Sequence, residues 1–163
     1  MIVKELRIRN FRSIVKADIE LHELSLFVGL NDVGKSNVLK ALNLFFNNET
    51  DYGRKFIFES DYSKYTPKRI KKAEEISIEL IIQLPITYSN GQLVKWSKIW
   101  RKNGTPHQEI KFSNGKDFPP RSRIPAWLLN IRYSYIPAIR DNSYFLSSCL
   151  IYMTLWLRLL RVN

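Results

Sequence analysis

The sequence predicts an α/β fold with a substantial antiparallel β portion, and three observations support that prediction. Residues 2–21 alternate between apolar and polar side chains on either side of a polar corner, as in a β-hairpin. The glycine-containing turn at 29–34 is followed by apolar residues spaced as on one face of a helix. Alternating segments separated by Asn-Gly pairs then fill much of the region 75–115, as in a β-meander.

Length and composition restrict the broad class of protein. With 163 residues, 45% of them hydrophobic, the chain is long enough for one domain with a real core and too short for two. Its formal net charge of +11 favours polyanionic partners such as nucleic acid or an acidic membrane surface. The single cysteine, Cys149, cannot form an internal disulfide, and the first residues lack the long apolar segment of a signal peptide. We therefore expect a cytoplasmic protein.

The first elements are predicted from local patterns. Ile2 to Ile8 alternates roughly, and Ile14 to Leu21 alternates again after the polar corner Asn10 to Ser13, so the two should pair as a hairpin. Ser25 to Val28 is a short apolar run, which is typical of a strand covered on both faces. A helix is expected from Gly34 to Asn47, because its apolar residues recur at spacings of three and four.

The region after this helix is predicted to be mainly β-structure. Asp51 to Lys72 has no clear period and is expected to be a surface loop. Glu75 to Leu84 and Leu93 to Arg101 alternate as strands, the second with two tryptophans on one face. Hairpin-type Asn-Gly pairs begin at 90, 103 and 114. Ile131 to Ile136 is the last strand candidate.

The residues from Gly29 to Ser36 fit the phosphate-binding pattern G-x-x-x-x-G-K-[ST], between a predicted strand and a predicted helix, as that pattern requires. Main-chain N–H groups from Asn31 to Ser36 can converge on a triphosphate, and the helix N-terminus adds partial positive charge. Glycine at each end of the pattern permits close backbone approach. Lys35 would reach the outer phosphates, and the Ser36 hydroxyl would coordinate Mg²⁺.

The sequence thus predicts a P-loop site for a nucleoside triphosphate and Mg²⁺, with Ser36 as the metal ligand. The alternative is a coincidental glycine-rich turn before an unrelated helix. The residues of the predicted loop are Gly29, Leu30, Asn31, Asp32, Val33, Gly34, Lys35 and Ser36.

Two longer segments, LRIRNFRSI and LFVGLNDVGKSNVLKALNLFF, resemble the start of the ATPase heads in the RecF, SMC and OLD (overcoming lysogenization defect) group. YIPAIRD, Tyr135 to Asp141, is similar to a segment of OLD-like and related phage-defence ATPases. The resemblance implies an AAA-type P-loop ATPase, namely the N-terminal lobe of an ABC-type head over residues 1–141, with 142–163 as an apolar tail outside the family pattern. It also implies that Arg12 lies near the nucleotide and Asn37 near its inner phosphates. The alternative for Arg12 is a solvated turn arginine.

The function implied by this resemblance is ATP binding within an OLD- or RecF-like ATPase that acts in DNA processing, repair or phage defence. Hydrolysis in this group needs an acidic Walker B pair, a signature segment from a second head and a switch histidine. The sequence contains neither of the first two, and His22 and His107 do not lie where the third is expected. Phe56 to Asp61 does place one acid after three apolar residues, but it reads more simply as a short strand or turn with capping acids.

No catalytic residue is therefore assigned, and ATPase activity is expected only if missing segments complete a truncated head. The resemblance implies DNA and a second ATPase head, in a homodimer, as partners of the complete family protein.

Two other interpretations stay open. The run Lys68 to Lys72, with Trp96 and Trp100 beside lysines, allows a basic non-enzymatic DNA-binding module, although charge runs are usually solvated and paired strand tryptophans usually lie in a core. Asn142 to Leu157 carries no charge but falls short of the roughly 20 apolar residues that cross a bilayer, so membrane insertion is not expected. This tail fits a core helix or a premature end, and the latter would make the chain a nonfunctional truncated remnant.

Overall fold

The computed structural model describes residues 2–30, 34–67, 73–86 and 91–136. Its centre is a five-stranded antiparallel sheet in the order β2-β1-β5-β6-β7. The strands of this sheet are β1 (Ile2–Phe11), β2 (Ile14–Glu20), β5 (Glu75–Gln83), β6 (Leu93–Arg101) and β7 (His107–Phe112). The remaining elements are α1 (Lys35–Asn47), the short pair β3 (Glu49–Asp51) and β4 (Arg54–Lys55), α2 (Phe58–Asp61) and α4 (Ile124–Leu129).

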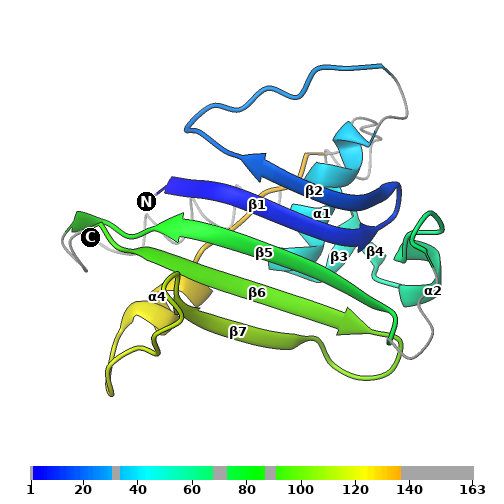
Figure 1. Ribbon diagram of the computed structural model, residues 1–163. Coiled ribbons are helices and arrows are strands. Elements are labelled where there is room, and N and C mark those ends of the chain that lie inside the picture. Colours follow the sequence, from blue (N-terminus) through cyan, green and yellow to red (C-terminus); the bar gives the residue numbers. More distant parts are fainter. Residues whose placement is uncertain (1, 31–33, 68–72, 87–90, 137–163) are drawn as a thin grey trace, which may run out of the picture.

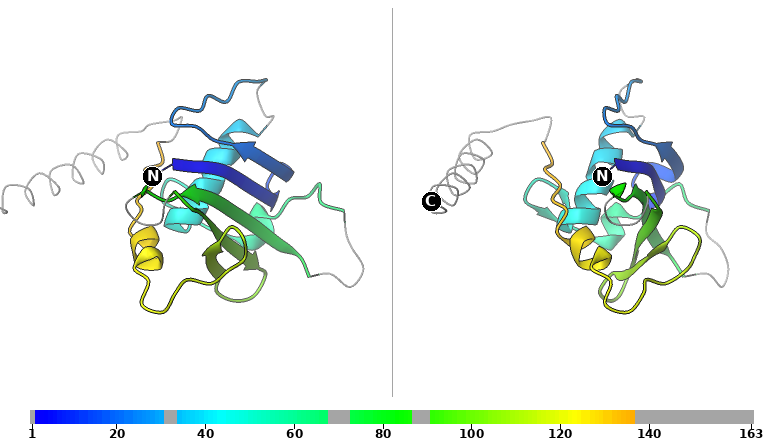
Figure 2. Two further views of the ribbon diagram at one scale, coloured as in Figure 1. Left: turned by 60° about the vertical axis from the view of Figure 1, so that its left-hand side comes forward. Right: turned by 90° about the vertical axis from the view of Figure 1, so that its left-hand side faces the viewer.

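Helix α1 covers one face of the sheet, and the core lies between them (Figure 1, Figure 2). Alternate residues of three neighbouring strands line up in this core, since Leu6 is paired with Leu80 and Leu80 with Trp96. The helix contributes Leu44 and Phe45, both fully buried, and the Phe45 and Trp96 rings meet edge to face at 4.8 Å. Burying such large apolar side chains is the main driving force that seats the helix on the sheet.

The opposite face of the sheet is charged, and its charges are largely matched. Arg7 donates to Glu5 at 2.6 Å and to Glu79 at 2.9 Å, and Lys95 lies 3.6 Å from Glu79. Arg9 pairs in the same way with an acid of β2. Exposed pairs of this kind contribute little stability, about 0–1 kcal/mol each. They do reduce the net positive charge that these strands present to a polyanion.

The predicted architecture is confirmed in most of its elements. The antiparallel hairpin, the helix ending at Asn47, the strand from Glu75 and the strand Leu93–Arg101 all occur, and β5, β6 and β7 form a meander. Trp96 and Trp100 do share one face, but that face is the core, where each is only 3% exposed. The suggestion that these rings cover a nucleic-acid strand is therefore wrong.

Three local predictions are also wrong. Residues 25–28 form no strand: this segment runs past β2 (Figure 1) but is not paired with β2 or with any other strand of the described residues. The expected loop at 51–72 contains β4 and α2, since Phe58 and Asp61 are buried against the sheet corner. Residues 131–136 pack along α1 without strand pairing, and the helix α4 before them was not predicted.

Several predictions concern residues outside this description. Asn90, the basic run 68–72 and the tail 142–163 are among them. In the part of the chain that the structure describes, no helix combines the length and the apolar character that a membrane span requires.

Candidate phosphate-binding site

The N-terminus of α1 is arranged to receive an anion. Gly34 is the N-cap residue, and its carbonyl accepts hydrogen bonds from the N–H groups of Asn37 at 3.0 Å and Val38 at 3.2 Å. No side chain caps this end of the helix, and its first turn contains no acidic residue. The first N–H groups and the positive end of the helix dipole are thus left to interact with a ligand such as phosphate.

Lys35 lies folded over the start of the loop. Its ammonium group donates to the carbonyl oxygens of Gly29 at 2.6 Å and Leu30 at 2.5 Å. A lysine ammonium has three N–H donors, so two bonds to the loop leave a donor and the positive charge for a phosphate oxygen. The lysine therefore links the start of α1 to the start of the loop.

The corner of the β1–β2 hairpin supports the other side of the loop. Ser13 Oγ accepts a hydrogen bond from Asn37 Nδ2 at 2.9 Å. The same oxygen lies 2.9 Å from the position that a Cβ atom on Gly34 would occupy, and Gly34 has φ 102°. Any other residue at this position would be strained and would collide with the corner. The second glycine of the motif is therefore fixed by a specific contact and by its backbone conformation.

A hollow of about 550 Å³ adjoins this end of the helix. One wall consists of Ser13 in the hairpin corner and of residues 14–17 of β2, and another is the extended segment 26–28. Gly34, Lys35 and Val38 close it at the base. A polar loop and a lysine at one end, with apolar walls beyond, are the features expected of a pocket for a ligand with both charged and apolar parts.

Arg12 also lies at this corner, held by an acid from a distant part of the chain. Its Nε donates to Asp61 Oδ1 at 2.8 Å, and its main-chain N–H donates to the Asp61 carbonyl, also at 2.8 Å. The Arg12 side chain is only 18% exposed, so it is not a freely solvated turn arginine. It is next in sequence to Ser13, which contacts the phosphate loop.

The structure brings most of the predicted site residues together. The described part of the loop consists of Gly29, Leu30, Gly34 and Lys35. Ser36 is exposed in the first turn of the helix. Asn37 bonds Ser13 in the hairpin corner, and Arg12 is the neighbour of Ser13 in that corner. Asn31, Asp32 and Val33 lie outside the described residues.

Ser13 and Asp61 were not predicted to belong to this site. Asp61 could have been suspected because it is an acid in the apolar surroundings of FIFESDY, but the sequence carries no signal for its partner.

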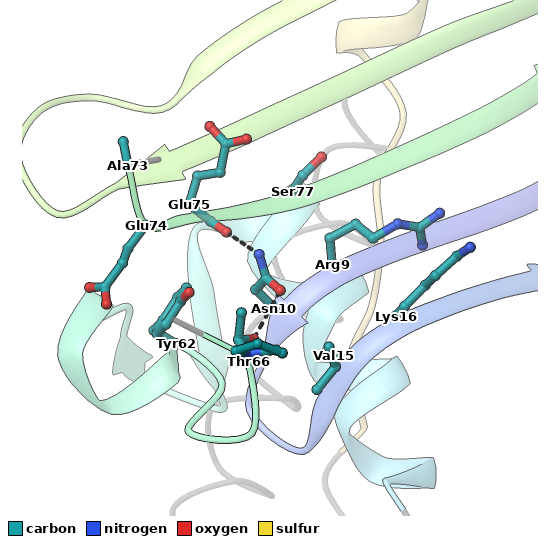
Figure 3. A pocket seen from close by; sticks show the side chains of 11 residues that line it. Arg9, Asn10, Val15, Lys16, Tyr62, Thr66, Ala73, Glu74, Glu75 and Ser77 are labelled. Atoms are coloured by element: carbon teal, nitrogen blue, oxygen red, sulfur yellow. Dashed lines mark hydrogen bonds between the residues drawn. The ribbon is translucent and has the colours of Figure 1, made fainter. Parts of the chain in front are cut away.

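A second, larger cavity of about 760 Å³ lies at the outer side of the same hairpin (Figure 3). Asn10 stands at its edge, donating to the Glu75 carbonyl at 2.8 Å and accepting from Thr66 Oγ1 at 2.9 Å. Arg9, which also lines it, is already bonded to two main-chain carbonyls and to Asp18. Asn10 and Arg9 are thus already hydrogen-bonded within the protein, so neither is left to converge on a ligand in this cavity.

Comparison with known proteins places this arrangement in a family. The family model of the AAA ATPase domain matches residues 1–125. Endonuclease GajA of Bacillus cereus (strain VD045) is 42% identical over 66 residues, which are 39% of this chain and 11% of GajA. The OLD nuclease of Thermus scotoductus is 27% identical over 89 residues, which are 55% of this chain and 16% of that protein. The chain thus spans only a small part of the length of these curated relatives.

Solved structures share the fold at lower identity. The recombination mediator protein RecF, in its structure with ATP, has a TM-score of 0.51 at 22% identity, over 76% of this chain and 30% of that one. An SMC ATPase has a TM-score of 0.53 at 18% identity, over 79% of this chain and 76% of that one. These likenesses confirm the predicted P-loop fold of the ABC type. The chain belongs to the AAA ATPase domain family.

Proposed function

We propose that this chain binds ATP and Mg²⁺ through residues 29–37 and forms the N-terminal lobe of an OLD- or RecF-like ATPase that acts on DNA. The observation that carries the proposal is the position of Lys35, whose ammonium is held on the Gly29 and Leu30 carbonyls at the uncapped end of α1. A polyphosphate is bound best where a cation and free helix N–H groups lie close together and where glycine lets the main chain approach the phosphates.

Each group then has a chemical role. Main-chain N–H groups of the loop and of the helix start would hold the β- and γ-phosphates, and Lys35 would bond an outer phosphate oxygen with its remaining donor. The Ser36 hydroxyl, exposed in the first turn, would be a ligand of Mg²⁺. Bound Mg²⁺ offsets phosphate charge, and the residues of this chain bind and orient the nucleotide.

Turnover is proposed to need further segments. The sequence has no acidic pair after an apolar run and no Leu-Ser-Gly-Gly segment, which are the segments that hydrolysis in this group requires. The SMC ATPases compared above are described as undergoing ATP-driven dimerisation and DNA-stimulated activation. We extend this to a second ATPase head and DNA as the partners of the complete protein here, with DNA processing, repair or phage defence as the role.

The alternative of a DNA-binding module without nucleotide has lost part of its support. The two tryptophans that it invoked, Trp96 and Trp100, are buried in the core, and Arg7 of β1 and Lys95 of β6 on the outer face are paired with acids. Salt-dependent DNA binding in the absence of ATP would favour this alternative.

The decisive measurement is a titration with fluorescent ATP in the presence of Mg²⁺. We expect Lys35→Ala to weaken binding by about 10-fold to 100-fold, because a hydrogen bond to a charged group contributes about 1.5–3 kcal/mol. Lys116→Ala is a matched control, because Lys116 is an exposed lysine in the turn after β7, outside the phosphate loop. Equal affinity of Lys35→Ala and the unchanged chain would contradict the assignment.

A further inference from the structure

The corner between β1 and β2 has an unfavourable backbone conformation. Arg12 has φ 51° although it is not glycine, and Asn10 just before it has φ 58°. Residues other than glycine adopt this left-handed region at an energetic cost, so the conformation persists only where the surrounding structure enforces it. Such strain is often found next to functional groups, and here the strained corner contacts the phosphate loop.

Asp61 bonds this corner through both its side chain and its main chain. It lies at the end of α2 and is only 2% exposed. Its Oδ1 accepts from Arg12 Nε, its main-chain carbonyl accepts from the Arg12 N–H, and its Oδ2 accepts from the Ile57 N–H at 3.1 Å. A buried carboxylate bonded at both oxygens is fixed in place, and it fixes its partner in turn.

The residues after Asp61 extend this attachment along the main chain. Tyr62 forms an isolated antiparallel bridge with Phe11, and the Ser63 N–H donates to the Asn10 carbonyl at 3.0 Å. The segment that carries Tyr62 therefore runs directly against the hairpin corner (Figure 3).

The corner contacts the start of α1 through Ser13. Ser13 Oγ accepts from Asn37 Nδ2 and lies against Gly34, so a shift of the corner would change the environment of the loop residue Gly34 and of Asn37 in α1. A chain of direct contacts thus leads from Asp61 through Arg12 and Ser13 to the start of α1.

We infer that Asp61 is a positioning residue for nucleotide binding, which it supports by holding the Arg12–Ser13 corner against the phosphate loop. The inference rests on the proposed function, since it concerns the affinity of that site for ATP. Asp61 does not itself contact the loop. Its effect on ATP is therefore expected to pass through Arg12 and Ser13.

The test is the dissociation constant for ATP and Mg²⁺ of Asp61→Asn, measured calorimetrically at a temperature where circular dichroism shows the variant to be folded. We expect affinity to fall about 10-fold, because asparagine has nearly the shape of aspartate but no charge to hold the guanidinium. Glu59→Gln is the matched control: it removes an acid of the same short helix that is 62% exposed and lies 3.9 Å from Lys102. This control should bind ATP like the unchanged chain.

A double-mutant cycle separates positioning from general stability. If Asp61 acts through Arg12, then Asp61→Asn should cause no further loss of ATP affinity in a chain that already carries Arg12→Gln. Additive losses would mean that Asp61 acts by another route, such as its bond to Ile57, and would overturn the inference.

Ser13→Ala provides a test that leaves the buried ion pair intact. It removes the acceptor of the Asn37 side chain, and we expect ATP affinity to fall about 3-fold even if Asp61→Asn does not fold. Failure of the unchanged chain to bind ATP would contradict the proposed function itself. ATP binding by the unchanged chain, with unaltered affinity in Ser13→Ala and in any folded Asp61→Asn, would contradict this inference alone.

Discussion

At the scale of single residues, the site depends on how closely the main chain of Gly34 approaches the hairpin. Its φ of 102° and the 2.9 Å separation between Ser13 Oγ and an added Cβ are two independent reasons for glycine at this position. Ser13 Oγ, the atom that leaves no room for a side chain at position 34, also accepts the hydrogen bond from Asn37. A larger residue at position 34 would therefore disturb this hydrogen bond as well.

Gly34→Ala tests this coupling. We expect the free energy of unfolding to fall by at least about 1–2 kcal/mol, the cost of a left-handed conformation for an alanine, and ATP affinity to fall with it because the corner must move. Gly53→Ala is the control, since Gly53 also has positive φ (67°) but would place its Cβ with nothing within 4 Å. Urea denaturation measures the free energy of unfolding of both variants, and titration measures their ATP affinity. Equal losses in Gly34→Ala and Gly53→Ala would show that the Ser13 contact is unimportant.

Residue identities were predictable here only where a motif specifies them. Gly29, Gly34, Lys35 and Ser36 follow from the spacing of the phosphate-binding pattern, because each serves a ligand and not a distant part of the chain. The partner of Arg12 was not predictable, since Asp61 is separated from it by 49 positions and no periodic pattern connects them.

At the scale of elements, α1 is held at its C-terminal end as well as at its loop. Asn48 has φ 58° and its N–H bonds the Leu44 carbonyl, while Lys98 from β6 donates to the Phe45 carbonyl at 2.7 Å. Burial lowers the pKa of Lys98, whose ammonium lies 5.0 Å from the centre of the Phe45 ring. The C-terminal end of α1 is thus stabilised by Asn48, a C-cap residue in the left-handed conformation, and by the Lys98 ammonium from the sheet.

Tyr133, in the segment after α4, packs against helix α1. Its hydroxyl donates to the Leu39 carbonyl at 3.2 Å, its ring stacks on Phe46, and its own carbonyl accepts from Asn47 Nδ2. Burial, with a smaller contribution from Tyr135, raises the pKa of Tyr133 to about 12. The neutral phenol is the form that the folded state favours.

Stability should therefore depend on this tyrosine in alkaline solution. An unfolded tyrosine has a pKa of about 10, so its contribution is fully present below pH 10 and is lost as pH rises from about 10 to about 12. We expect the free energy of unfolding of Tyr133→Phe to fall less steeply over this interval than that of the unchanged chain. Parallel pH profiles from denaturant titrations of the two proteins would contradict the burial of this hydroxyl.

The strands of the sheet were predictable because their periodicity is local. Alternation over Leu93–Arg101 places Trp96 and Trp100 on one side, as observed. The pattern does not state whether that side faces a ligand or a helix. The packing of α1 decides this, because the aromatic residues of the helix occupy the same face.

At the scale of the whole molecule, the segment before the phosphate loop is an unpaired extended chain with two different sides. Phe27 packs against the core, whereas every second residue around it is exposed. These exposed apolar residues are Leu24 (88%), Leu26 (84%), Val28 (84%) and Leu30 (81%). An exposed apolar row of this kind favours association with another polypeptide.

We therefore expect the isolated chain to self-associate, and the double variant Leu26→Ser and Val28→Ser to do so less. Ile86→Ser is the control, because Ile86 is equally exposed at 82% but lies outside this row. Light scattering against concentration measures the effect. Identical association of the double variant and the unchanged chain would exclude this row as the contact. Insoluble expression without nucleotide binding in all variants would instead favour a nonfunctional remnant.

By itself, the sequence determined the features that depend on neighbours in the chain: the hairpin, the helix after the loop, the meander and the phosphate-binding motif. Periodicity and spacing are properties of short segments, so they can be read without knowing the fold. Tertiary structure alone decided that Asp61 holds Arg12, that the tryptophans face α1, and that residues 25–28 lie unpaired beside β2. Each of these depends on which distant segment lies alongside, and a strand exists only where another strand bonds it.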